Sequence, residues 1–257
     1  MPWGRPDFAP GGQPGPEGGY AYDVALSIST DAGDTWQPAL SAHTDGTPTE
    51  HGFVTLFPWQ DAIGAVWLDG RNMVAGDASG DRPTDEIRDI FATRFVGGAW
   101  QAPAPVGGDG WHIDGCPVNG PAVDADGEAV VVAWFTAAAD RPRVELAWSG
   151  NDGKTFGQPV EVDAERALGR VDVVLLADGD AIVSWLRSME QGGSVSVRRV
   201  SSDGSRGPIR TVGQTSTSRP AGFPQMVAAG DYLVMSWTEV LEGSSRVSTA
   251  RIALDAI

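Results

Sequence analysis

Short runs of β-branched and other apolar residues recur along this chain, and four of them end at a tryptophan. They occupy residues 62–67, 128–134, 180–185 and 231–237. The intervals between successive tryptophans, taken from their residue numbers, are 67, 51 and 52. A repeat of this length is typical of folds in which one four-stranded sheet recurs along the chain. The pattern therefore predicts a repeated β architecture.

Each tryptophan run is one strand of a larger repeated unit. A turn signal and another strand precede it, at 52–61, 120–127, 169–179 and 222–231, which predicts a hairpin. An alternating segment follows, at 86–94, 143–148, 194–200 and 246–252. We name the four strands of the unit a to d, counted outward from a central axis. Helical periodicity is nearly absent.

The two ends of the repeat are incomplete. Segments 22–29 and 37–40 predict strands c and d alone, and the last unit ends after its strand c. Residues 1–19 are rich in Pro and Gly and predict an irregular arm. We therefore predict an all-β β-propeller of four-stranded blades over residues 20–257, with about five blade-like units.

Two turns between strands c and d share one spacing. Residues 29–36 (STDAGDTW) and 149–156 (SGNDGKTF) both place Ser, Asp or Asn, Gly, Thr and an aromatic ring at matched positions. In such a turn the Asp or Asn accepts backbone N–H groups, Gly supplies a positive φ, and the ring is expected to pack between neighbouring sheets. The pattern resembles the Asp box of sialidases and other BNR-repeat propellers. In that family these turns lie away from the substrate, so we interpret Asp31 and Asn151 as structural.

Composition narrows the classes of partner. Asp and Glu number 34 against 18 Lys and Arg, a net charge of −16 that disfavours nucleic acid and anionic membranes. We interpret this acidity as a solvated surface, with calcium binding as the lesser alternative. There is no long apolar segment and no export signal, so we expect a soluble, monomeric protein whose location stays open. A secreted or periplasmic location is compatible with a mature chain.

The strand order sorts the loops between two faces of the propeller. The d–a loops (43–51, 108–119, 164–170, 213–221) and the b–c loops (68–86, 138–143, 187–193, 240–245) open on the same face. All three histidines of the chain lie in d–a loops. The same loops hold Glu50, Trp111, Asp114, Cys116, Arg170 and Arg219, and Asp69 and Arg71 stand at the end of a strand b. Loops on a rigid scaffold commonly carry binding residues, so we predict the functional site on this face.

The resemblance to sialidases implies roles for these residues. Sialidases clamp the substrate carboxylate with three arginines, use a Tyr–Glu pair as nucleophile and use an Asp as acid/base. The candidates for such a clamp are Arg71, Arg170 and Arg219, and a salt bridge that ties adjacent blades is the alternative role for each of them. The resemblance implies acid/base candidates Asp69, Glu50 and Asp114, and Tyr20, or else Tyr22, as nucleophile. We expect His51, His112 and Trp111 to contact substrate.

Several strings resemble a bacterial exo-sialidase-like branch: 50–54 (EHGFV), 67–71 (WLDGR), 86–90 (EIRDI) and 115–121 (GCPVNGP). The chain also departs from the sialidase pattern. Only Gly4-Arg5-Pro6 stands where a six-bladed sialidase begins with its first arginine, and neither Tyr20 nor Tyr22 has the family's surrounding motif. Relative to a six-bladed member the chain is about one blade short, and 72–85 marks a place where a repeat was lost.

Three hypotheses for function follow from the sequence. The first is a sialidase-like glycoside hydrolase of the exo-α-sialidase type, acting on terminal acidic sugars. The second is a non-catalytic propeller that binds glycan or protein on the same face. The third, a five-bladed furanosidase-type enzyme with inner-strand carboxylates, is disfavoured by the Asp boxes.

Metal binding is a further role that the loop histidines could have. The ligands would be His43, His51, His112 and Cys116, because imidazole and thiolate suit transition metals. Their spacing is not compact, so we expect neither a metal nor a cofactor, and a carbohydrate or small-molecule ligand.

Overall fold

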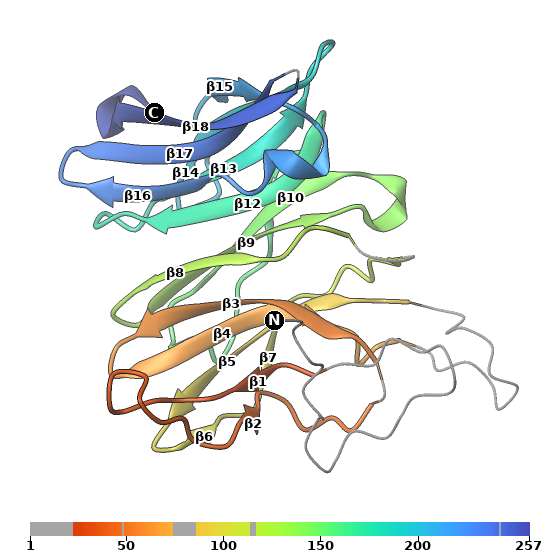
Figure 1. The fold of residues 1–257 in the computed structure, drawn as a ribbon, viewed down its shortest axis with the longest axis vertical. Coiled ribbons are helices and arrows are strands. Elements are labelled where there is room, and N and C mark those ends of the chain that lie inside the picture. The colour runs from red at the N-terminus through yellow and green to blue at the C-terminus, as the bar shows by residue number, and fades with distance from the viewer. Residues whose placement is uncertain (1–22, 48, 74–85, 114–116, 242) are drawn as a thin grey trace, which may run out of the picture.

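The computed structural model describes residues 23–47, 49–73, 86–113, 117–241 and 243–257 (Figure 1). In these ranges the regular structure consists of β-strands and three single-turn 3₁₀ helices, Ala138–Asp140, Arg219–Ala221 and Leu254–Ala256. No helix of the described residues is long and apolar enough to cross a membrane.

The strands form four large sheets and one small one, and every pairing is antiparallel. The N-terminal sheet is β1 (Ala25–Leu26) and β2 (Leu40–Ser41). The first large sheet is β3 (His51–Trp59), β4 (Ala62–Asp69), β5 (Asp89–Val96), β6 (Ala99–Trp100) and β7 (Ala104–Gly107). The second is β8 (Ala122–Asp126), β9 (Ala129–Thr136), β10 (Arg143–Ser149) and β11 (Val160–Asp163). The third is β12 (Ala167–Leu175), β13 (Ala181–Ser188), β14 (Gly193–Val200) and β15 (Arg210–Thr215), and the fourth is β16 (Gln225–Ala229), β17 (Tyr232–Leu241) and β18 (Ser244–Ala253).

The sheets are stacked in chain order. The N-terminal sheet and the fourth sheet lie at opposite ends of the stack in Figure 1. The first strand of each large sheet, called here its inner strand, contacts the inner strand of the next: β3 with β8, β8 with β12, and β12 with β16. An all-β chain with four-stranded antiparallel sheets among its units is thus confirmed, whereas the number of blades and the closure of a ring stay predictions.

The repeated tryptophans fix how one sheet packs on the next. Trp134 on β9 and Trp237 on β17 are buried on the second strands of their sheets. Each lies against a glycine on the outer strand of the preceding sheet. A Cβ on Gly107 would lie 2.5 Å from Trp134 Cζ2, and one on Gly213 would lie 2.3 Å from Trp237 Cζ2. The tryptophan repeat in the sequence is therefore a repeat of intersheet contacts.

The inner strands line an open cavity and carry bulges at one end. The pairing register shifts in β3 between Gly52 and Thr55, and in β12 between Gly169 and Asp172. Phe53 and Arg170 lie inside these bulges with φ of 55° and 56°. A cavity of about 290 Å³ lies along the inner strands, and its lining includes Phe53, Thr55, Val171, Asp172, Phe223 and Gln225. Bulges redirect side chains, so they determine what faces this end of the sheets.

Partly buried carboxylates tie neighbouring inner strands together. Asp124 Oδ2 on β8 accepts the N–H of Leu175 on β12 at 2.8 Å. Asp172 Oδ2 on β12 accepts the N–H of Met226 on β16 at 2.7 Å. The same type of contact thus recurs between successive sheets.

The two turns that share one spacing, at 29–36 and 149–156, have the hydrogen bonds that their sequences predict. In the first, Asp31 Oδ1 accepts the N–H of Thr35 at 2.9 Å, and in the second Asn151 Oδ1 accepts the N–H of Thr155 at 3.1 Å. The aromatic residues differ. Phe156 packs against the core, but Trp36 is 64% exposed, so the predicted packing of Trp36 between sheets is wrong. Among the described residues the N-terminal sheet lies at the end of the stack (Figure 1).

Candidate functional site

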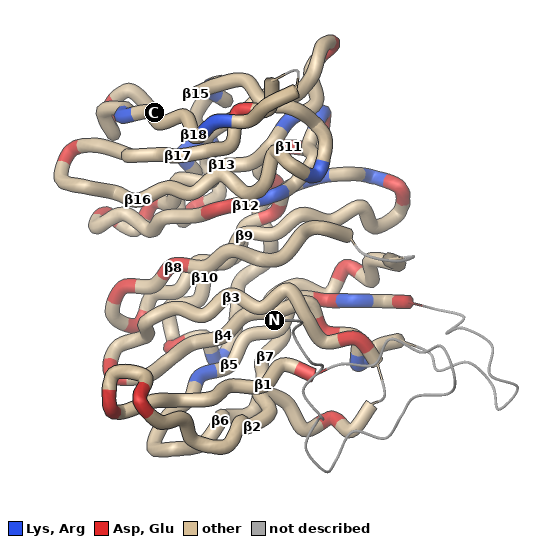
Figure 2. The backbone as a smooth tube through the Cα atoms, in the orientation of Figure 1, with Lys and Arg blue, Asp and Glu red and all other residues tan. Residues whose placement is uncertain are grey.

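A row of buried polar side chains crosses the first sheet at one end. His51 on β3 pairs in register with Asp69 on β4, and Asp69 pairs with Asp89 at the start of β5. All three are buried. Figure 2 shows acidic and basic segments together at this end of the sheet. Antiparallel pairing brings these residues together, although 18 or more residues separate each from the next in the sequence.

Asp69 is the most completely bonded member of this row. Its Oδ1 accepts Arg71 Nε at 2.7 Å, and its Oδ2 accepts Arg71 Nη2 at 2.7 Å and Trp67 Nε1 at 2.8 Å. The Arg71 guanidinium also lies over the ring of Phe91, 3.9 Å from its centroid. A bidentate pair of this kind neutralises a buried carboxylate. Arg71 therefore forms a bidentate ion pair with Asp69.

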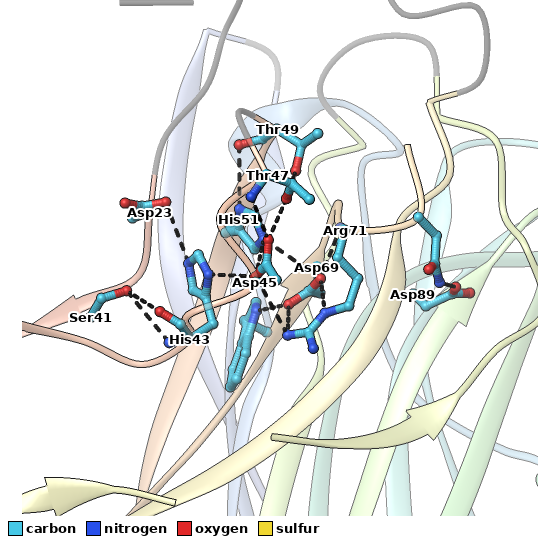
Figure 3. Close-up of polar contacts among 12 residues, drawn as sticks. Asp23, Ser41, His43, Asp45, Thr47, Thr49, His51, Asp69, Arg71 and Asp89 are labelled. Atoms are coloured by element: carbon cyan, nitrogen blue, oxygen red, sulfur yellow. Dashed lines mark hydrogen bonds and ion pairs between the residues drawn. The ribbon is translucent and has the colours of Figure 1, made fainter. Parts of the chain in front are cut away.

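His43, Asp45 and His51 form a second group beside Asp69 (Figure 3). His43 Nδ1 lies 2.8 Å from Asp45 Oδ2, and His51 Nε2 lies 3.3 Å from the same oxygen. The two imidazole rings are stacked with centroids 3.7 Å apart. Burial, and then the charge of His43, lower the pKa of His51. Burial raises the pKa of Asp45, but the hydroxyl and N–H of Thr47, together with the two histidines, outweigh it, so that pKa lies below its usual value.

Arg88 is a site residue that the sequence reasoning did not identify. Its side chain is 2% exposed, and its Nη2 lies 2.6 Å from Glu50 Oε2 and 3.5 Å from Glu86 Oε2. Next to it, Asp89 accepts Asn72 Nδ2 at 2.7 Å, and burial raises the pKa of this carboxyl. The alternation of Glu86, Arg88 and Ile90 in the sequence was the available signal. It places Arg88 on the same side of the strand as the buried Ile90.

Arg170 and Arg219 form a separate group at the third and fourth sheets. Arg170 is 8% exposed, and its Nη1 donates to the carbonyl of Ser218 at 2.8 Å. Burial, and then the positive charge of nearby Arg219, lower the pKa of Arg170. Within the described ranges neither guanidinium has an acidic partner. This pair is the group most suited to an external anion.

The structure brings together some of the predicted residues. Glu50, His51, Asp69 and Arg71 lie at one end of the first sheet, and His112 joins Ile87 there by an isolated β-bridge. The indole of Trp111 meets the ring of Phe135 edge-on, with centroids 5.5 Å apart. Tyr20, Tyr22, Asp114 and Cys116 lie outside the described residues.

The predicted three-arginine clamp is divided. Arg71 is paired with Asp69, whereas Arg170 and Arg219 lie at the junction of the third and fourth sheets. The three arginines therefore do not converge on one site.

Comparison with known proteins finds distant similarity to solved structures alone. No protein-family model matches the chain, and no curated protein matches its sequence. Among solved structures, the xyloglucan PUL GH43B of Bacteroides ovatus has 14% identity and a TM-score of 0.46, over 79% of this chain and 38% of that one. The Hadza microbial sialidase Hz136 has 15% identity and a TM-score of 0.48, over 78% and 44%.

A third similar structure is Zg3597, a family 117 glycoside hydrolase of Zobellia galactanivorans. It has 8% identity and a TM-score of 0.48, over 79% of this chain and 66% of that chain. This chain thus spans 38 to 66% of the length of the three structures.

Proposed function

We propose that this chain binds an acidic carbohydrate, with the sugar carboxylate held by Arg170 and Arg219. The observation that carries the proposal is the buried Arg170 side chain, whose Nη1 donates to the carbonyl of Ser218 directly before Arg219, while neither arginine has an acidic partner among the described residues. The chain has 34 acidic residues for 18 basic ones, so a lone arginine pair is unusual in its composition.

The surroundings of the Arg170 guanidinium favour the binding of an anion. Burial removes it from water, and a second positive charge beside it adds repulsion. A carboxylate relieves both effects, because planar guanidinium groups bind carboxylates in a bidentate manner. The bulge fixes the backbone, since Asn119 Oδ1 accepts the Arg170 N–H at 2.7 Å. Preorganisation of this kind lowers the entropic cost of binding.

The neighbouring cavity suits a sugar ring. Its lining combines the aromatic rings of Phe53 and Phe223 with the polar groups of Thr55, Asp172 and Gln225. Small-molecule sites commonly combine apolar walls with a few polar groups that orient the ligand. Arg170 is not among the lining residues but directly precedes one of them, Val171, and the proposal places the rest of the sugar at this cavity.

Hydrolysis of a terminal acidic sugar, in the manner of an exo-α-sialidase, is the second candidate function. It is favoured by Asp172, whose pKa is raised to about 6 by burial. A carboxyl with such a pKa is suited to donate a proton at near-neutral pH. Both of its oxygens, however, accept backbone N–H groups, from Val173 and Met226, which is the arrangement of a structural tie. Binding is therefore the first proposal.

The test is calorimetric titration with a methyl α-sialoside. Arg170→Gln and Arg219→Gln should each weaken binding by about tenfold or more, since each removes one charged contact to the carboxylate. The matched control is Arg210→Gln, which removes an exposed positive charge from β15. Equal affinity of the wild type and both clamp variants would exclude the site, as would an equal loss in the control.

Hydrolysis is tested separately with a fluorogenic sialoside. If Asp172 donates the proton, Asp172→Asn abolishes turnover but keeps calorimetric binding. Binding without turnover in the wild type would assign the chain to the non-catalytic class of propeller.

A further inference from the structure

We propose that His43, His51 and Asp23 form a binding site for a divalent transition-metal ion, of which Zn²⁺ is the natural probe. The site stands apart from Arg170 and Arg219 and rests on no part of the proposed function. One nitrogen of each imidazole and one carboxylate oxygen of Asp23 lie within 4.8 Å of one another. Two imidazoles and a carboxylate form a common ligand set for such ions.

The inward-facing nitrogens of the two histidines carry the argument. His43 Nε2 and His51 Nε2 are both buried, and neither makes a hydrogen bond within the described part of the chain. The His43 side chain is 4% exposed and that of His51 is 0% exposed. A buried polar atom without a partner is costly, and it calls for an explanation such as a bound ion.

The other nitrogen of each ring already has an acceptor. His43 Nδ1 lies 2.8 Å from Asp45 Oδ2, and His51 Nδ1 lies 3.3 Å from the carbonyl oxygen of Thr49. Both acceptors require a proton on Nδ1, so the lone pair of each neutral imidazole lies on Nε2. Histidines that bind metals are characteristically held in this way, with the second nitrogen donating to a carboxylate or a carbonyl.

Those Nε2 lone pairs face negative oxygens. His43 Nε2 lies 3.5 Å from Asp23 Oδ1, and His51 Nε2 lies 3.3 Å from Asp45 Oδ2 and 3.6 Å from Asp69 Oδ1. Figure 3 shows His43 between the carboxylates of Asp23 and Asp45. A lone pair directed at a carboxylate is repulsive, and a cation bound by the two Nε2 atoms and Asp23 would be attracted to all three carboxylates.

The local charge matches a divalent ion. Asp23, Asp45 and Asp69 contribute three negative charges, and Arg71 contributes one positive charge. With neutral imidazoles the net charge of the group is −2, which a divalent cation cancels. Asp69 is bonded to Arg71 through both oxygens, so it is not a ligand. Asp45 is a positioning residue, because it accepts the Nδ1–H of His43.

Zinc binding is tested in a variant that lacks the other soft ligands of the chain. The sequence has three histidines and one cysteine, so His112→Gln with Cys116→Ser leaves only His43 and His51. Competition with a chromophoric chelator should give one Zn²⁺ per chain. Asp23→Asn, a change at a half-exposed carboxylate, and His43→Gln should each weaken this binding by about tenfold or more. The matched control is Asp34→Asn, at a fully solvated turn position, which should leave binding unchanged.

The site is also tested without any substitution among the ligands. In long-range ¹H–¹⁵N spectra, Zn²⁺ should shift the Nε2 resonances of His43 and His51, whereas Ca²⁺, which prefers oxygen ligands, should not. Absence of zinc binding would overturn the proposal. So would binding that is indifferent to Asp23→Asn and His43→Gln, or Nε2 resonances that do not move. The spectra decide the question even if His43→Gln fails to fold.

Discussion

Replacing Gly107 with alanine tests the contact that joins one sheet to the next. The new Cβ would lie 2.5 Å from Cζ2, 3.1 Å from Cη2 and 3.2 Å from Cε2 of Trp134. The indole is 2% exposed and lies in a packed cluster, so it has little room to move away. Overpacking of a core by one methyl group commonly costs about 1–3 kcal/mol. We expect a loss at the upper end of that range, because the closest atom belongs to a rigid ring.

The matched control is the next residue. A Cβ on Gly108 meets no atom within 4 Å, so Gly108→Ala should leave the free energy of unfolding within about 0.5 kcal/mol of the wild type. Urea denaturation followed by tryptophan fluorescence measures both. In a Trp134→Phe background, which removes the indole atoms that clash, Gly107→Ala should cost less. Equal stability of the two alanine variants, or the same cost in both backgrounds, would refute the packing argument.

Two further predictions concern buried charges. The Asp172 pKa is raised from 3.8 to about 6, so its stability contribution is present below its unfolded pKa and is lost as pH rises through the folded value. The wild type should therefore lose about 3 kcal/mol of its free energy of unfolding between pH ~4 and ~6, and Asp172→Asn should not show this loss. Urea titration at several pH values measures both, and the same pH slope in the two proteins would contradict the prediction. Arg88→Met removes a buried cation that lies 2.6 Å from the half-buried Glu50 carboxylate and should destabilise by about 3–5 kcal/mol, whereas Arg141→Ala at an exposed pair with Glu161 should cost less than about 1 kcal/mol. Similar losses in these two variants would show that burial of the pair is not the cause.

Hydrophobic patterning was sufficient to predict the order of strands. Trp67, Trp134, Trp185 and Trp237 all lie on the second strand of a sheet, as the repeat indicates. This succeeds because each unit repeats one packing problem, a large ring against the outer strand of the preceding sheet. The exposure of Trp36 was not predictable in the same way, since it depends on whether another sheet packs against this turn.

The site was only partly predictable because it depends on pairing across strands. The sequence placed His51 and Asp69 in loops on one face, but only the register of β3 and β4 shows that they are opposite each other. Arg88 was missed because charged residues at the start of a strand are usually solvated. The burial of its side chain beside Glu50 depends on tertiary packing, which the sequence does not show. The division of the arginine clamp was not predicted either, because the sequence does not show that Arg71 pairs with Asp69.

The backbone conformation of Arg170 was also beyond the reach of patterning. A positive φ at a residue other than glycine is uncommon, and here it depends on Asn119, which lies 51 residues earlier in the sequence. The bulge recurs at Phe53 in the first sheet, so the strain belongs to the fold, and the choice of arginine at this position is the specific feature of the site.

The central claim is that a carboxylate binds at Arg170 and Arg219. It is tested most directly by titrating the wild-type chain with a methyl α-sialoside and with the methyl ester of the same sugar, which lacks only the negative charge. We predict that the acid binds about tenfold or more tightly than the ester. Equal affinities for the two compounds would contradict the account.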